Sequence, residues 1–242
     1  GQGGAVVIAW VWGPPRIAFR AAGPENNFNR RRILAAIGVL ISHAYPISLG
    51  PDVAEPLSAQ LGGITLGTVS VMIFFSISGF FITRSFAGQA SLARFLQARC
   101  LRLFPALIVV SAVTVLVAGF WLTTGPQTVF WAAAPEYILR NITLFSLTYD
   151  LPGVFAANVY GPAINGSLWT LSYEVLCYLG VVVAGLAGLL TRPRLFALAL
   201  TGFAVVYGFN MVHPMHTRID SLLMLALPFA IGTAFWVWRK VI

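Results

Sequence analysis

An arginine and a histidine lie eleven residues apart in an apolar segment, Arg32 to Leu49, that is long enough to cross a membrane. Charged and titratable side chains are costly to place in lipid, so both residues are candidates for function. Eleven steps of 100° are three turns plus about 20°, so in a helix Arg32 and His43 share one face, about 16 Å apart along the axis. A guanidinium at the membrane surface with an imidazole buried above it suits an enzyme that handles an anionic, activated donor.

Glu174 is the only acidic residue inside a predicted membrane span. It lies seven residues after Ser167, so the two share a helix face with Tyr178, one turn further on. An unpaired carboxylate in a membrane costs about 2.5 kcal/mol or more, so Glu174 needs a partner. Arg32, His43 and a hydroxyl of the substrate are the candidate partners, and a structural hydrogen bond between helices is the alternative interpretation.

A basic segment follows the second apolar stretch. Residues 91–104 have the pattern of an amphipathic helix that ends at Pro105, with Arg94, Arg99 and Arg102 on one side and apolar residues around most of the rest. Such a helix lies at the membrane surface. Two interpretations stay open: the arginines anchor the helix to lipid phosphates, or they clamp a diphosphate, which planar guanidinium groups bind well.

Composition identifies the class of protein that positions these residues. Hydrophobic residues make up 58% of the 242 residues, charged residues only 9%, and the mean hydropathy is +0.84. Soluble chains contain about 25% charged residues. We therefore predict an all-α, polytopic membrane helix bundle with a cytoplasmic amphipathic helix in addition to about six transmembrane helices. The predicted spans lie near residues 33–49, 62–83, 105–123, 167–190, 195–212 and 221–238.

The net charge of +8 is distributed asymmetrically. With the N-terminus in the cytoplasm and successive spans alternating, thirteen basic residues face the cytoplasm and only Arg140 and Arg218 face outward. This is the positive-inside pattern, so the charge predicts an orientation in the membrane and not a nucleic-acid partner. Because arginine is used almost to the exclusion of lysine, we expect a bacterial protein in the cytoplasmic (inner) membrane, N-terminus inside.

Four motifs occur in order along the chain: Asn26-Asn-Phe-Asn29 followed by Arg32 and His43, then Phe74-Phe-Ser-Ile-Ser-Gly-Phe-Phe-Ile82, then Phe95-x3-Arg99-x2-Arg102-x2-Pro105, and then Ser167-Leu-Trp169-x-Leu-x-Tyr-Glu174-x3-Tyr178. Together they resemble the integral-membrane acyltransferase 3 family, which acetylates O-antigen, Nod factor and exopolysaccharide. The resemblance covers roughly residues 26–240. Asn29 stands where the family usually has Asp.

The resemblance implies a membrane-bound O-acyltransferase that moves an acyl group, commonly acetyl, from acyl-CoA to a hydroxyl of an envelope carbohydrate or lipid-linked sugar. It implies catalytic roles for His43 and Glu174. It implies no permanently bound cofactor and no metal; the expected partners are acyl-CoA (acetyl-CoA in the first instance), the carbohydrate acceptor and the lipid bilayer. The residues expected to bind substrate are Arg32, Arg99, Arg102, Ser78, Gly79, Ser167 and Trp169.

The family also implies about ten spans. We therefore predict a membrane acyltransferase domain over residues 26–242 that lacks the C-terminal helices, preceded by an extension of unassigned role over residues 1–25. Small residues such as Ser76, Ser78 and Gly79 let helices approach closely or leave a slot for an acyl chain, and close packing is the preferred interpretation. His213 and His216 could suggest a metal site, but with no cysteine and only Asp220 nearby we do not favour one.

Acyl transfer from a thioester to an alcohol needs a base for the hydroxyl proton, which histidine supplies near neutral pH. Three routes are open: direct attack with His43 as the base, a covalent acyl-histidine, and relay through another nucleophile. We favour direct attack, because no Ser or Cys is evidently paired with His43. Two other functions also stay open: a transporter or flippase for an anionic envelope precursor, and an inactive truncated acyltransferase.

Overall fold

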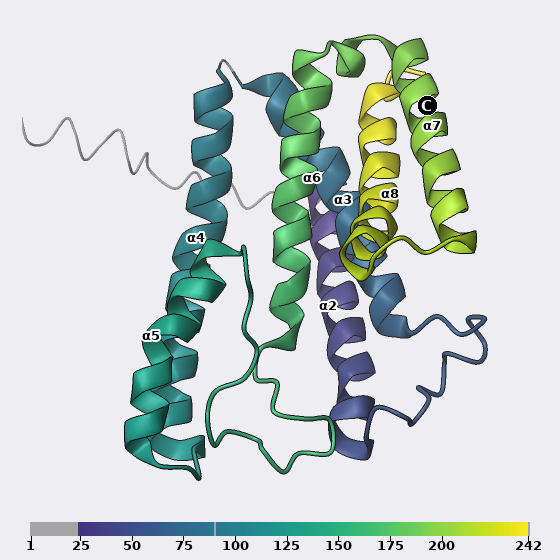
Figure 1. The fold of residues 1–242 in the computed structure, drawn as a ribbon. Coiled ribbons are helices and arrows are strands. Elements are labelled where there is room, and N and C mark those ends of the chain that lie inside the picture. Colours follow the sequence, from purple (N-terminus) through teal and green to yellow (C-terminus); the bar gives the residue numbers. More distant parts are fainter. Residues whose placement is uncertain (1–23, 90, 242) are drawn as a thin grey trace, which may run out of the picture.

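A computed structural model describes residues 24–89 and 91–241, in which long helices dominate and no strand occurs (Figure 1). The extension predicted for residues 1–25 falls almost entirely outside the described residues. The helices are α2 (Pro24–Leu49), α3 (Leu66–Gly88), α4 (Leu92–Val117), α5 (Gln127–Thr143), α6 (Trp169–Leu186), α7 (Pro193–Val212) and α8 (Thr217–Val237).

The all-α prediction and the prediction of six transmembrane helices are confirmed. Six helices in the described part of the chain are long and apolar enough to cross a membrane. They run from Phe28 to Leu49, Leu66 to Gly88, Leu92 to Leu122, Gly166 to Leu186, Pro193 to Val212 and Thr217 to Val237.

The structure corrects the prediction of a separate amphipathic helix over residues 91–104. These residues form the first turns of α4, which runs through Pro105 without a break. Proline removes one helical hydrogen bond, but its φ is compatible with a helix, and such prolines are tolerated in membrane helices. Arg99 and Arg102 therefore lie on the end of a spanning helix, at a fixed position relative to the bundle.

α5 was not predicted, because residues 125–165 lie between two of the predicted spans. It lies beside the second half of α4 (Figure 1) and buries Phe130, Ala134 and Tyr137 against Val115 and other residues there. The loop after α5 is then held by Asn141, whose side chain donates to the Thr148 carbonyl at 2.9 Å. α5 and the loop after it together cover the end of the bundle from which α6 starts.

α3 is the helix against which the site is assembled, and its most extensive contacts are with α8 and α2. Toward α8 the backbones nearly touch: a Cβ added at Gly79 would lie 2.0 Å from the carbonyl oxygen of Phe229, and one added at Gly232 would lie 1.9 Å from that of Ser76. Gly79 is buried in this contact, so it packs helices together and leaves no slot for an acyl chain.

Toward α2 the contact again uses small residues. A Cβ added at Gly38 would lie 2.4 Å from Ser70 Oγ, and one added at Gly67 would lie 2.7 Å from Ser42 Oγ. Small residues four apart on one helix, facing small residues on the next, are the usual means by which membrane helices approach closely. This contact sets the position of His43, which directly follows Ser42.

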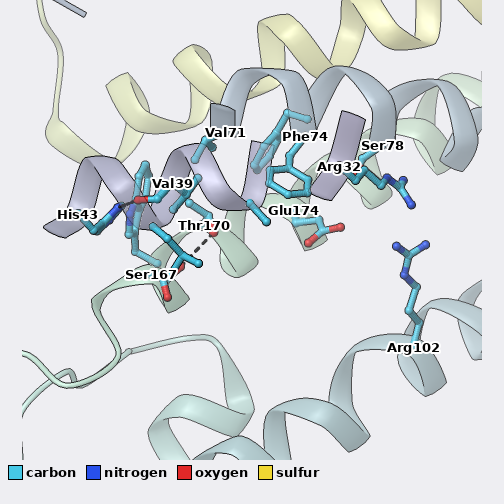
Figure 2. A pocket seen from close by; sticks show the side chains of 14 residues that line it. Arg32, Val39, His43, Val71, Phe74, Ser78, Arg102, Ser167, Thr170 and Glu174 are labelled. Carbon is cyan, nitrogen blue, oxygen red and sulfur yellow. Dashed lines mark hydrogen bonds between the residues drawn. The ribbon is translucent and has the colours of Figure 1, made fainter. Parts of the chain in front are cut away.

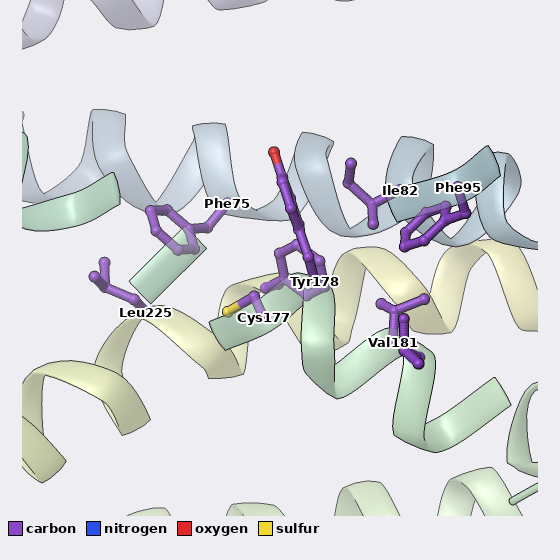
Figure 3. Packing of buried hydrophobic residues seen from close by; sticks show 9 residues of the cluster. Phe75, Ile82, Phe95, Cys177, Tyr178, Val181 and Leu225 are labelled. Atoms are coloured by element: carbon purple, nitrogen blue, oxygen red, sulfur yellow. The ribbon is translucent and has the colours of Figure 1, made fainter. Parts of the chain in front are cut away.

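A third contact holds α6 against α3 and α8. Figure 3 shows Cys177 and Tyr178 of α6 among the buried side chains of this cluster, with Phe75 and Ile82 of α3 beside them. Both α6 residues are at least nine-tenths buried. Because Tyr178 lies one turn beyond Glu174, the cluster also determines where that carboxylate points.

The helix ends divide the molecule into two ends of different charge. α3 ends, α4 begins and α8 ends at the same end of the bundle, drawn uppermost in Figure 1. α2 begins further down on that side, where Phe28 packs against Phe80 and Phe81 of α3. We call it the arginine end, because every described Arg and Lys except Arg140 and Arg218 lies in or next to the helix ends that meet there.

Candidate active site

A cavity of about 560 Å³ opens between α2, α3, α4 and α6 (Figure 2). We call it the central cavity. Most of the predicted site residues line it, although they come from four separate motifs. Those that do are Arg32, His43, Ser78, Arg102, Ser167, Trp169 and Glu174; Gly79 and Arg99 do not.

The tautomer of His43 follows from its one hydrogen bond. Its Nδ1 lies 2.9 Å from the carbonyl oxygen of Val39, one turn back along α2. A carbonyl can only accept, so Nδ1 carries a proton, and in the neutral ring Nε2 then keeps the lone pair. Nε2 has no hydrogen-bond partner among the described residues. The ring is thus held in the form that can take a proton from a hydroxyl in the cavity.

At the arginine end the central cavity adjoins a recess of about 290 Å³, lined by Arg32, Arg99, Arg102, Asn29, Phe81 and Ser85. Arg32 and Arg102 line both spaces. The Arg32 guanidinium stacks over Phe81 at 5.4 Å from the ring centre, and Arg99 donates to Ser85 at 3.4 Å. The Nε of Arg99 is buried and has no hydrogen-bond partner in the part of the chain that the structure describes. Three guanidinium groups arranged in this way have the chemistry to bind an anion.

Glu174 belongs to the arginine side of the central cavity. It accepts a hydrogen bond from the Tyr178 hydroxyl and interacts electrostatically with Arg32 and Arg99. Figure 2 shows its carboxylate between His43 and Arg102, turned toward the arginines. The predicted contact between this carboxylate and the imidazole is not among the contacts of the described residues.

The reason for the difference is the depth at which α6 begins. Ser167 and Thr170 lie near His43 (Figure 2), so α6 starts at the level of His43. Glu174 is two turns further along and therefore about 10 Å deeper than Ser167. Glu174 and His43 share the cavity but occupy different levels of it.

Apolar side chains form the wall between the two levels. Val39, Val71, Phe74 and Phe75 line this stretch, and Ser78 adds the only hydroxyl that α3 contributes. Such a wall accommodates an uncharged chain and excludes water from it. The central cavity thus has a cationic end, an apolar middle and a histidine at the far end.

Two residues of the site were missed by sequence reasoning. Tyr178 was placed on the right helix face but was not identified as the partner of Glu174, although the spacing of four residues is the signal for such a pair. Glu55 lies between the first two predicted spans, yet it is buried and accepts a hydrogen bond from Ser42 at 2.8 Å. No sequence signal marks a buried carboxylate in a loop.

His43 also lines a second cavity, of about 400 Å³, on the side away from the arginines. We call it the loop cavity, because it is bounded by the end of α2, the loop of residues 50–65 and Tyr160. An added Cβ at Gly50 would lie 2.9 Å from Val159, so the segment before α6 packs directly on the end of α2. His43 is the residue at which the two cavities meet.

Comparison with known proteins gives the family. Residues 26–242 match the Acyltransferase domain family, acyltransferase 3. The chain is 34% identical over 164 residues to an O-acetyl transferase of Shigella phage Sf6, and the aligned region covers 67% of this chain and 47% of that protein. It is 35% identical over 166 residues to Nodulation protein 10 of Rhizobium leguminosarum bv. viciae, and the aligned region covers 66% of this chain and 44% of that protein.

The chain therefore spans about half the length of the curated relatives it matches. No solved structure matches it. The family match extends over all the helices that build the two cavities, and it includes each of the four motifs. The chain belongs to the acyltransferase 3 family.

Proposed function

We propose that this chain carries the acyl-transfer site of a membrane-bound O-acyltransferase, which moves an acetyl group from acetyl-CoA to a hydroxyl of an envelope carbohydrate or lipid-linked sugar. The observation that carries the proposal is the central cavity, which connects a cluster of three guanidinium groups to an imidazole with a free Nε2. The relative named an O-acetyl transferase supports the transfer of an acetyl group to an oxygen atom.

The donor fits the cavity by its chemistry. The phosphates of acyl-CoA lie in the recess with Arg32, Arg99 and Arg102, where charge-assisted hydrogen bonds hold them. The flexible pantetheine arm follows the apolar wall past Phe74 and Val39. About three helix turns separate Arg32 from His43, so the thioester reaches the imidazole while the phosphates stay at the arginine end.

The transfer proceeds by direct attack. The acceptor hydroxyl gives its proton to Nε2 of His43 as its oxygen bonds to the thioester carbonyl carbon. The carbon–sulfur bond then breaks, and the thiolate leaves with the proton from the imidazolium, so that the products are an ester and free CoA. The Val39 carbonyl holds the ring and stabilises its transient positive charge.

We also propose how the protein is oriented in the membrane and in which membrane it lies. The arginine end faces the cytoplasm of a bacterial cell, where acetyl-CoA is made, and the opposite end faces outward. Glu174 is then a positioning residue: it balances the charge of Arg32 and Arg99 and is itself held by Tyr178.

The test compares envelope glycans from cells with the gene, without it, and with the variant His43→Ala. Mass spectrometry should find an added acyl mass only with the parent protein. The matched control is His213→Ala, because His213 is exposed and lies outside both cavities. It should acylate like the parent.

The proposal is wrong if His43→Ala, present in the membrane at the parental level, still acylates at near-parental rate. A gene-dependent change in the amount of an anionic envelope precursor on one side of the membrane, without any acyl mass, would instead favour a flippase.

A further inference from the structure

The loop cavity differs in charge from the site at the arginine end. Its charged side chains are carboxylates, those of Asp52 and Glu55, and no Arg or Lys is among the residues that line it. An anionic donor is therefore favoured at the arginine end and disfavoured here. His43 is the one described residue that lines both cavities. A donor in the central cavity and an acceptor in the loop cavity would therefore meet at its imidazole.

Glu55 is the unusual residue of this cavity. It is only 6% exposed, although it lies in a loop. Its Oε2 accepts two hydrogen bonds, from Ser42 Oγ at 2.8 Å and from the Leu66 amide at 3.0 Å. Its Oε1 is buried and has no partner among the described residues. A buried acceptor without a donor is costly, so its presence calls for a ligand that donates.

The position of Glu55 links it to the base. Ser42, which binds its Oε2, directly precedes His43 on α2, and Gly67 packs against the Ser42 side chain at the start of α3. Glu55 therefore joins both helices at the place where the loop cavity reaches the imidazole. Tyr160 lines the same cavity and offers a flat ring with a polar end.

We infer that the loop cavity is the acceptor subsite and that it takes an uncharged sugar residue, one of whose hydroxyls donates to Glu55 Oε1. This contact presents a neighbouring hydroxyl to Nε2 of His43. A sugar that carries a carboxylate or phosphate is repelled by Asp52 and Glu55. The inference rests on the proposed function and adds to it the class of acceptor and the residue that positions it.

The decisive variant is Glu55→Gln. The amide oxygen keeps the two hydrogen bonds made by Oε2, and the NH₂ group replaces Oε1, so an acceptor becomes a donor at nearly constant shape. The substrate is the envelope glycan of the cells that lack the gene, freed of ester-linked acyl groups by mild alkali. Membranes containing the protein transfer labelled acetyl from acetyl-CoA to this glycan.

We expect Glu55→Gln to raise the KM for the glycan about five- to ten-fold, because a charge-assisted hydrogen bond is lost, and to leave the KM for acetyl-CoA unchanged. A merely structural role would move both constants. Glu136→Gln is the matched control: that carboxylate is exposed and paired with Arg140 at 2.7 Å on α5, and both constants should stay parental. Mass spectrometry of the product should place the acetyl group on an uncharged sugar.

An unchanged KM for the glycan in Glu55→Gln overturns the inference, as does an acetylated sugar that carries a carboxylate or phosphate. If Glu55→Gln does not accumulate in the membrane, Ser42→Ala serves instead. It removes one bond that orients the carboxylate, and a parental KM for the glycan in that variant overturns the inference too. Absence of transfer by the parent protein would contradict the proposed function itself.

Discussion

Arg102 repels both Arg32 and Arg99, and Glu174 is the acidic side chain among the described residues that offsets part of this charge. An anion with several oxygens removes the rest of the repulsion. The unpaired Nε of Arg99 points to the same conclusion, because a buried donor without an acceptor is costly. The arrangement at this end is therefore suited to an anionic ligand.

Changing Arg99 or Arg102 to Gln should lower the affinity for acetyl-CoA about ten-fold or more, since each change removes a charge-assisted hydrogen bond worth about 1.5–3 kcal/mol. Titration calorimetry on the purified protein measures it. Arg94→Gln is the control, because Arg94 is on the same helix but exposed and lines neither the recess nor the central cavity. Equal affinity in all three variants would mean that the arginines serve only as anchors at the membrane surface.

Glu174 and Tyr178 act as a pair, and the pair does not contact His43. Glu174→Gln should therefore reduce acetyl transfer without abolishing it, and Tyr178→Phe should do the same. Because both changes break one interaction, the double variant should be little worse than the more damaging single variant. Initial rates of the three proteins decide this. Effects that multiply, or a complete loss in Glu174→Gln, would show that the carboxylate acts on the reacting groups directly.

At the scale of the helices, the site depends on how closely α3 approaches its two neighbours. The contacts at Gly38 and Gly67 place α2, and those at Gly79 and Gly232 place α8. Side chains larger than hydrogen have no room there, because the nearest atoms on the α8 side belong to backbone that cannot move aside. The glycines thus fix the positions of the helices that line the central cavity.

Gly79→Ala should destabilise the protein, because the added Cβ would lie 2.0 Å from the Phe229 carbonyl oxygen. Overpacking of this kind costs about 1–3 kcal/mol, which corresponds to a fall of several degrees in the unfolding midpoint. The control is Gly202→Ala in α7, where nothing lies within 4 Å of the added atom. Alanine favours helix over glycine, so that variant should be as stable as the parent or slightly more stable.

Thermal unfolding in detergent, followed by loss of helical circular dichroism, measures both proteins. An unchanged midpoint in Gly79→Ala would mean that α3 and α8 are less closely packed than described.

At the scale of the whole molecule, the helix ends put nearly all described basic residues on one side. If this side is cytoplasmic, a cysteine at Gln89, just after α3, should be protected from an impermeant reagent in intact cells. A cysteine at Thr128, exposed in α5 at the opposite end, should be labelled. Both are made with Cys100 replaced by Ser, since Cys100 is exposed, whereas Cys177 is buried.

Labelling after the membranes are permeabilised is the control, and it should reach both positions. Equal labelling of the two cysteines in intact cells would contradict the orientation, and with it the delivery of the donor from the cytoplasmic side.

The sequence by itself determined the all-α membrane class and the six spans. It also identified Arg32, His43 and Glu174, which line the central cavity, as candidate site residues. Hydropathy and charge act locally: an apolar run of this length must become a helix in lipid, and a charge inside it is too costly to be incidental. The spacing of Arg32 and His43 also predicted that they share one helix face, because a shared face depends only on the period of a single helix.

The tertiary structure decided what these residues touch. The depth at which α6 begins separates Glu174 from His43, and the position of α4 brings Arg102 into the central cavity. The burial of Glu55 depends on a loop folding onto two helices. Each of these is a relation between segments far apart in the chain, set by packing of small and apolar side chains, and no period or composition within one segment contains it.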